Sequence, residues 1–245
     1  MIVNGINSSF HLACDDAKRK DLVITIDGPA GAGKTTVSKI IAERLHYRYI
    51  DTGALYRAVA YETCAAGIAP NDDAGLKTLC KGLVLDLKQS DKGGRLYSNG
   101  KDISEFIRTP KITMLASAVS ARKPVREYLL EIQKNFGRNK RVVLEGRDMG
   151  TVIFPQADVK FFLMASVKAR AQRRFKQMEG NCEQNLEQVE QDILRRDNND
   201  SKRDIAPLKP AEDAILIDST VLSLEQVIDT MLTHIGNVWG ISLAD

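Results

Sequence analysis

Residues 26–36, IDGPAGAGKTT, decide the fold of this 245-residue chain. Gly28, Gly33, Lys34 and Thr35 have the spacing G-x-x-x-x-G-K-[ST] of a phosphate-binding loop. Glycines leave room for consecutive backbone N–H groups to converge on a phosphate. The lysine would place a charge between the β- and γ-phosphates, and the threonine would offer a hydroxyl to Mg²⁺. The segment therefore predicts a nucleoside triphosphate site.

The residues on either side of the loop have the patterns of a strand and a helix. LVITI (22–26) is an apolar, β-branched run suited to a buried parallel strand. After the loop, Val37, Ile40, Ile41 and Leu45 recur at helical spacing. The order of strand, loop and helix places a helix N-terminus opposite the phosphates. It distinguishes a phosphate-binding loop from a glycine-rich turn that has no function.

The composition is that of an ordinary globular chain, with 27% charged and 43% hydrophobic residues. A net charge of +3 is too small to indicate a nucleic-acid partner. The four cysteines are scattered, so we expect neither disulfides nor a zinc site, and a reducing cytosol fits. No apolar run reaches about 18 residues, so no membrane span is expected. Residues 1–20 lack the apolar segment of a signal peptide and are expected to form a short flexible extension.

Apolar strands alternate with helical patterns along the rest of the chain. In addition to 22–26, strands are predicted at 47–50, 141–145, 159–164 and 214–218. Helices are predicted from about Leu55 and over 111–119, 125–136, 166–178, 185–196 and 224–235. The last helix begins with a capping box, Ser223 and Gln226. The alternation predicts an α/β fold built on a doubly wound, five-stranded parallel sheet.

Residues 71–122 have a different character. LVLDL (83–87) and RLYSNGKDI (95–103) predict short antiparallel strands, and Asn99-Gly100 is a strong hairpin dipeptide. This pattern predicts a lobe inserted into the parallel sheet. The domain 21–245 would then comprise a core (21–70, 123–165 and 206–245), an insert (about 71–122) and a helical lid (about 166–205) interrupted at Gly180-Asn181.

Arginines indicate what kind of P-loop protein this is. The chain has no N-K-x-D guanine-reading segment and no L-S-G-G-Q segment of transporter ATPases. Arginines follow the predicted strands or lie in charged helices: Arg57, Arg126, Arg147, Arg170, Arg173, Arg174, Arg196 and Arg203. Because guanidinium groups stabilise the charge gathered when phosphate is transferred between two phosphorylated molecules, the pattern favours a kinase with a phosphate as acceptor.

Four strings give the chain a family resemblance. DGPAGAGKTT (27–36), DTGALYR (51–57), EGRDMGTVIFPQA (145–157) and RRDNNDSKRDIAPL (195–208) closely resemble bacterial cytidylate kinase, a nucleoside monophosphate (NMP) kinase of the P-loop class. The resemblance implies CMP and dCMP as acceptors, ATP with Mg²⁺ as donor, and CDP or dCDP plus ADP as products. It also implies an NMP-binding insert and a monomer in the cytoplasm, without nucleic-acid or membrane partners.

The resemblance also implies an acceptor site. The implied CMP-binding residues are Thr52, Arg57, Ser117, Arg126, Arg147, Asp148, Arg196, Asp200 and Arg203. Asp148 would accept from the N4 amine of cytosine, while Arg126 and Ser117 would donate to N3 and O2. Uracil has a carbonyl in place of that amine, so we expect discrimination against it. Arg57 and Arg147 would bind the acceptor phosphate, and Arg196, Asp200 and Arg203 the sugar and phosphate.

The donor site follows from the loop and the lid. The expected ATP-binding residues are Gly28, Pro29, Ala30, Gly31, Ala32, Gly33, Lys34, Thr35 and Thr36. The expected catalytic residues are Lys34, Arg147, Arg170 and Arg174. Thr35 is the expected metal ligand, with Mg²⁺ held mostly by ATP and water. Asp27 and Glu145 end strands beside the loop, where either could steer metal-bound water or orient the loop by hydrogen bonds.

Two alternatives remain open at this point. One is a P-loop kinase for a different nucleotide or small-molecule acceptor. The other is a nucleotide-dependent switch or ATPase, which only the basic charge suggests.

Overall fold

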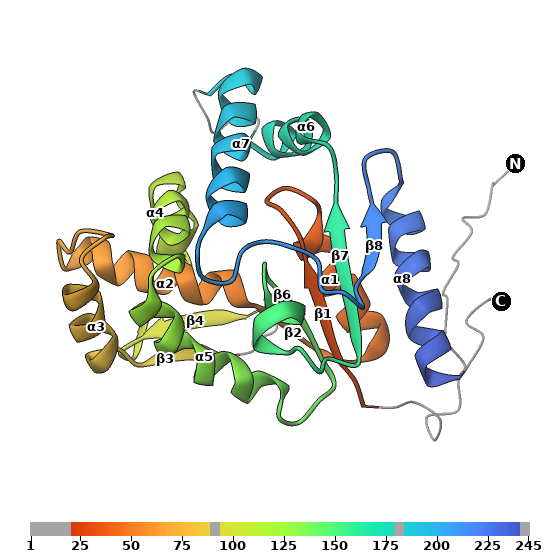
Figure 1. Ribbon diagram of the computed structural model, residues 1–245, viewed down its shortest axis with the longest axis horizontal. Helices are drawn as coiled ribbons and strands as arrows, with labels where there is room; N and C mark the ends of the chain where they lie inside the picture. Colours follow the sequence, from red (N-terminus) through yellow and green to blue (C-terminus); the bar gives the residue numbers. More distant parts are fainter. Residues whose placement is uncertain (1–20, 89–93, 179–183, 241–245) are drawn as a thin grey trace, which may run out of the picture.

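The computed structural model describes residues 21–88, 94–178 and 184–240. The predicted extension 1–20, the break at Gly180-Asn181, and Cys14 and Cys182 lie outside them. A five-stranded, all-parallel sheet with the strand order β2-β6-β1-β7-β8 forms the centre of the molecule (Figure 1). This confirms the predicted α/β fold and its parallel sheet.

The bounds of the elements lie close to the predicted ones. The sheet consists of β1 (Val23–Asp27), β2 (Arg48–Asp51), β6 (Val142–Glu145), β7 (Val159–Met164) and β8 (Ile215–Asp218). The helices are α1 (Lys34–Leu45), α2 (Thr52–Ala65), α3 (Asp73–Gly82), α4 (Pro110–Ser120), α5 (Lys123–Gly137), α6 (Val167–Met178), α7 (Leu186–Lys202) and α8 (Leu224–Trp239). None of the described helices is both long and apolar enough to cross a bilayer.

Alternate residues of the central strands enter two different hydrophobic cores. Ile24 and Ile26 of β1 point to the face covered by α1 and α8. Val23 on the same strand points to the opposite face and packs with Leu144 of β6. Since both faces are buried, these strands are apolar throughout, which is why they could be recognised as buried parallel strands.

A second hydrophobic core lies beside the sheet, at the left of Figure 1. Helices α2 to α5 surround it together with an antiparallel sheet of β3 (Leu85–Lys88), β4 (Arg95–Ser98) and β5 (Lys101–Asp102). Asn99 and Gly100 both have positive φ, 46° and 81°, as the predicted hairpin turn requires. The segment 71–122 thus shares one core with α2 and α5.

Two features of the helices were not predicted. Helix α3 buries only Leu76 and Cys80, one turn apart, which is too short an apolar pattern to stand out from the sequence. Helix α7 continues past the predicted end at 196 to Lys202. Its last turns contain asparagine and aspartate, which favour caps and turns over helix interiors, so tertiary contacts hold these turns helical.

The helices α6 and α7 pack on one another above the sheet. Ala171, Val189 and Ile193 form the core of the pair. Helix α7 also contacts α4 of the second core. The capping box at Ser223 and Gln226 is present at the start of α8, as predicted.

Candidate functional site

The phosphate loop connects β1 to α1 in a conformation that requires glycine. Gly28 has φ 144°, and a Cβ on it would lie 2.0 Å from the carbonyl oxygen of Leu163 in β7. Gly31 and Gly33 also have positive φ. The loop therefore passes directly over the end of β7, and its N–H groups and the N-terminus of α1 form a cradle for an anion.

Lys34 and Thr35 begin α1 inside this cradle. Lys34 is buried, 7% exposed, and its Nζ donates to the carbonyl oxygen of Pro29 at 2.8 Å. Burial and the positive charge of Arg147 lower the pKa of Lys34 well below its usual value. Thr35 Oγ1 donates to Glu145 Oε1 at 2.9 Å, and burial together with Asp51 raises the pKa of Glu145.

A cavity of about 810 Å³ extends from the phosphate loop across the carboxyl edge of the sheet. The expected site residues that line it are Ala30, Gly31, Ala32, Gly33, Lys34, Thr35, Thr36, Thr52, Arg57, Ser117, Arg147, Asp148, Arg174, Arg196, Asp200 and Arg203. Gly28, Pro29, Arg126 and Arg170 are not among the lining residues. Residues from distant parts of the sequence are thus brought to one continuous space.

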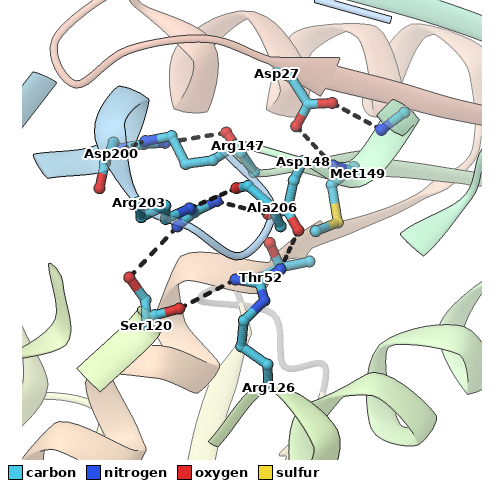
Figure 2. Close-up of polar contacts among 12 residues, drawn as sticks. Asp27, Thr52, Ser120, Arg126, Arg147, Asp148, Met149, Asp200, Arg203 and Ala206 are labelled. Atoms are coloured by element: carbon cyan, nitrogen blue, oxygen red, sulfur yellow. Dashed lines mark hydrogen bonds and ion pairs between the residues drawn. The ribbon is translucent and has the colours of Figure 1, made fainter. Parts of the chain in front are cut away.

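Asp148 is held between Arg126 and Arg203 in a buried charge cluster (Figure 2). Asp148 forms ion pairs with Arg126 and with Arg203, the latter at 3.4 Å. Arg126 also donates to the carbonyl oxygen of Ser120 at 3.2 Å, and Arg203 donates to that of Ala206 at 2.5 Å. Two arginines from different elements therefore fix one carboxylate at the cavity wall, and Arg126 acts from behind it.

A second group of side chains connects α7 to the end of β6. Arg147 Nε donates to Asp200 Oδ2 at 3.1 Å, and Ser117 Oγ of α4 donates to Asp200 Oδ1 at 3.4 Å. Nearby, Arg57 pairs with Asp51 at 2.6 Å. Thr52 donates its hydroxyl to the carbonyl oxygen of Glu145 at 2.6 Å, which ties the start of α2 to the end of β6.

Arg196 adds a positive charge to this wall that the carboxylates do not fully balance. Its Nε is buried and has no hydrogen-bond partner among the described residues. Burial and the neighbouring charge of Arg147 lower the pKa of Arg196 to about 10. A guanidinium with a buried and unused donor, close to further cations, indicates a site for an anion.

The three arginines of α6 have different surroundings. Arg170, 4% exposed, donates to the loop carbonyl of Ala30 at 3.0 Å and pairs with Asp197 of α7 at 2.7 Å. Arg173 donates to Ser219, while Arg174 is exposed along the cavity. The guanidinium of Arg170, an expected catalytic residue, is therefore engaged by protein groups in this structure.

Some lining residues were not singled out from the sequence. Tyr56 lies beside Arg57 in α2, and burial raises the pKa of its hydroxyl to about 12. The segment after β8 contributes Ser219, Leu222 and Leu224. Its position after a parallel strand could have indicated it, because loops at the carboxyl edge of such sheets form the binding crevice.

The side chains beside the phosphate loop are suited to a metal ion that is coordinated by oxygen atoms. Such an ion would enter the site bound to the phosphates of a nucleotide. Thr35 and Glu145 place a hydroxyl and a carboxylate side by side, which are ligand types suited to Mg²⁺. The described residues contain no cluster of three or more His, Cys, Asp or Glu side chains able to hold a metal. This donor set suits a metal held largely by substrate phosphates and water.

Comparison with known proteins is consistent with this geometry. The family model described as cytidylate kinase matches residues 24–237. A cytidylate kinase of Geobacter sulfurreducens (strain ATCC 51573 / DSM 12127 / PCA) is 49% identical over 216 residues, which are 88% of this chain and 93% of the relative. Cytidylate kinases of Geobacter sp. (strain M21) and Citrifermentans bemidjiense (strain ATCC BAA-1014 / DSM 16622 / JCM 12645 / Bem) are 48% and 47% identical over 215 residues. In both, this is 87% of this chain and 92% of the relative.

The surroundings of the α6 arginines predict different effects of replacing them. Arg170→Ala removes the partner of Asp197 and of the loop carbonyl, so we expect the free energy of unfolding to fall by about 3 kcal/mol. Arg174→Ala removes an exposed side chain and should change it by less than about 0.5 kcal/mol. Urea unfolding of both variants measures the difference. Equal stability of the two variants would contradict a structural role for Arg170.

Proposed function

The chain belongs to the cytidylate kinase family, and from this premise we propose how its cavity performs the reaction. The protein is an enzyme that transfers the γ-phosphoryl group of ATP to CMP or dCMP, giving ADP and CDP or dCDP. One observation carries the residue assignments: a single cavity joins the phosphate loop to the cluster around Asp148. Donor and acceptor can therefore meet inside it.

The donor phosphates bind in the loop between β1 and α1. The backbone N–H groups of the loop and the N-terminus of α1 hold the phosphate oxygens. Lys34 leaves the Pro29 carbonyl and turns to the β- and γ-phosphates, which offer it a stronger acceptor. Thr35 would hold Mg²⁺ through its hydroxyl, and the metal would supply charge neutralisation to the phosphates.

The acceptor phosphate binds among Arg57, Arg147 and Arg196. Arg196 has an unused buried donor, and Arg57 and Arg147 each exchange a protein carboxylate for the phosphate. A nucleoside monophosphate is ionised at neutral pH, so the nucleophilic oxygen needs no general base. Its approach to the γ-phosphoryl group is a matter of alignment and charge neutralisation, which Lys34 and the arginines supply.

The cytosine is read by Asp148 and Ser117, with Arg126 in support. Asp148 accepts from the N4 amine, and its two arginine partners hold the carboxylate in its orientation. Asp200, within reach of Ser117 and Arg147, is placed to accept from the sugar hydroxyls. Arg203 supports Asp148 from the end of α7, while Thr52 fixes the start of α2.

Movements of the two peripheral parts complete the proposal. The insert of about 71–122 closes on the acceptor, and the lid of about 166–205 closes on the donor. Arg174 then contacts the transferring group, whereas Arg170 acts through the loop carbonyl of Ala30 as a positioning residue.

We propose a monomer acting in the cytoplasm, without a nucleic-acid partner. The free thiols of Cys64 and Cys80 suit a reducing compartment.

A coupled assay of ADP release tests the acceptor assignment. ATP and Mg²⁺ are held constant while CMP, dCMP, UMP, AMP and GMP are compared. Turnover with CMP and dCMP well above the others is the expected result, because only cytosine combines an N4 amine with the N3 and O2 acceptors. Faster turnover with another nucleotide would overturn the proposed reading of the base.

Replacing Lys34 should stop the reaction without unfolding the protein. Lys34→Ala removes the only side-chain charge that the loop itself provides, and we expect kcat to fall at least about 10²-fold to 10³-fold. Lys39→Ala, on the exposed side of the same helix, is the matched control and should retain turnover. Substantial activity of Lys34→Ala would remove the proposed loop mechanism.

Replacing Asp148 should reduce the preference for cytosine more than it affects ATP. We expect Asp148→Ala to lower kcat/KM for CMP about 100-fold, with little change for UMP and in the KM for ATP. Because the substitution leaves two buried arginines without their carboxylate, Asp148→Asn serves as a second variant that keeps an acceptor and adds a donor suited to uracil. Unchanged selectivity in both variants, compared with the surface control Asp86→Asn, would place base recognition elsewhere.

A further inference from the structure

Asp27, the last residue of β1, forms hydrogen bonds across the sheet to the turn that follows β6. Its Oδ1 accepts from the Met149 N–H at 3.0 Å, and its Oδ2 accepts from the Gly150 N–H at 2.8 Å (Figure 2). These two residues directly follow Asp148 in the chain. One carboxylate on the donor strand thus holds both N–H groups next to the proposed base-reading residue.

The two bonded N–H groups have no other partner available in their own segment. Residues Met149–Ile153 form one turn of π-helix, in which the carbonyl of Asp148 accepts from Val152 and Ile153. The first N–H groups of any helix lack intrahelical acceptors, so Asp27 satisfies them from outside. A side-chain acceptor in this place fixes where the helix begins, and with it the backbone of Asp148.

Asp27 is not placed to contact a substrate or its metal. Its side chain is buried, with the residue 5% exposed, and it does not line the cavity. Burial, opposed by the two N–H bonds, raises its pKa to about 6, with Asp148 and Lys34 as the nearest charges. The two N–H bonds favour the ionised carboxylate, which accepts from both groups. Each of its oxygens accepts one backbone N–H, and we therefore assign Asp27 to the turn after β6 rather than to metal-bound water.

Steric contacts also restrict the position of the turn Met149–Ile153. A Cβ on Gly150 would lie 3.0 Å from Thr25 Oγ1 and 3.1 Å from Lys160 Cδ, so the glycine lies close against two strands. Thr25 is two residues before Asp27 on β1, and its buried hydroxyl has no hydrogen-bond partner among the described residues. The contact at Thr25 is thus steric, whereas the contact at Asp27 carries the hydrogen bonds.

We propose that Asp27 is a positioning residue for cytosine recognition, which sets the height and direction of Asp148 by holding the N–H groups of Met149 and Gly150. The inference rests on the proposed reading of cytosine by Asp148. Because Asp27 immediately precedes Gly28, the same residue fixes the acceptor base relative to the donor loop. Alignment of the two substrates then depends on one carboxylate that neither substrate touches.

Asp27→Asn tests the proposal, since an amide offers an acceptor to one N–H group and a mismatched NH₂ to the other. We expect kcat/KM for CMP to fall about tenfold, kcat/KM for UMP to change by less than about twofold, and the KM for ATP to remain within about twofold. Thr25→Val, on the same buried strand and of the same shape, is the matched control and should leave all three values unchanged. Gly150→Ala perturbs the same hydrogen bonds at the donor instead of the acceptor. It should likewise lower kcat/KM for CMP relative to UMP.

A double-mutant cycle separates this inference from the proposed function. In an Asp148→Ala background, Asp27→Asn should cause no further loss of cytosine selectivity, because it acts through Asp148. If Asp148→Ala loses selectivity while neither Asp27→Asn nor Gly150→Ala does, only the positioning role is overturned. A higher requirement for Mg²⁺ in Asp27→Asn, with the KM for CMP unchanged, would instead assign the residue to the metal and also overturn it.

Discussion

The close approach of the phosphate loop to β7 is the constraint on which the rest of the structure depends. Gly28 passes so near the Leu163 carbonyl that no side chain fits, and this fixes the height of the loop over the sheet. Neighbouring elements then attach to the loop at this height. Arg170 binds the carbonyl of Ala30, Ser219 donates to that of Ala32, and Glu145 accepts from Thr35. The loop is therefore the reference point for the lid, for the segment after β8 and for the end of β6.

The carboxylate partners of each arginine indicate whether it stabilises other protein groups or is available to bind a substrate. Buried charges are costly unless they are paired. Arg126 and Arg170 have carboxylate partners and do not line the cavity, so they support other groups. Arg57 and Arg147 are also paired but line the cavity, and Arg196 retains an unused donor there. The cavity wall thus carries positive charge that phosphates can complete.

The sequence was informative where the physical signal is local and less so where it depends on distant contacts. The glycine spacing and the β-branched strands predicted the phosphate loop and the parallel sheet, because both patterns are contained in a few consecutive residues. The sequence indicated Arg170 and Arg174 as catalytic candidates, but nothing near Arg170 in the chain showed that Asp197 would pair with it. The partners of Asp27 lie 122 and 123 residues further along the chain, and no pattern near Asp27 indicates them.

The packing of α6 on α7 has a consequence for whether the phosphoryl group goes to the acceptor or to water. Arg174 on α6 and Asp200 on α7 both line the cavity, and Ala171, Val189 and Ile193 join the two helices into one body. On the proposed roles of Arg174 and Asp200, the pair of helices α6 and α7 closes completely only when both substrates are bound. On these roles, closure of the helix pair on both substrates together would favour transfer to the acceptor over transfer to water.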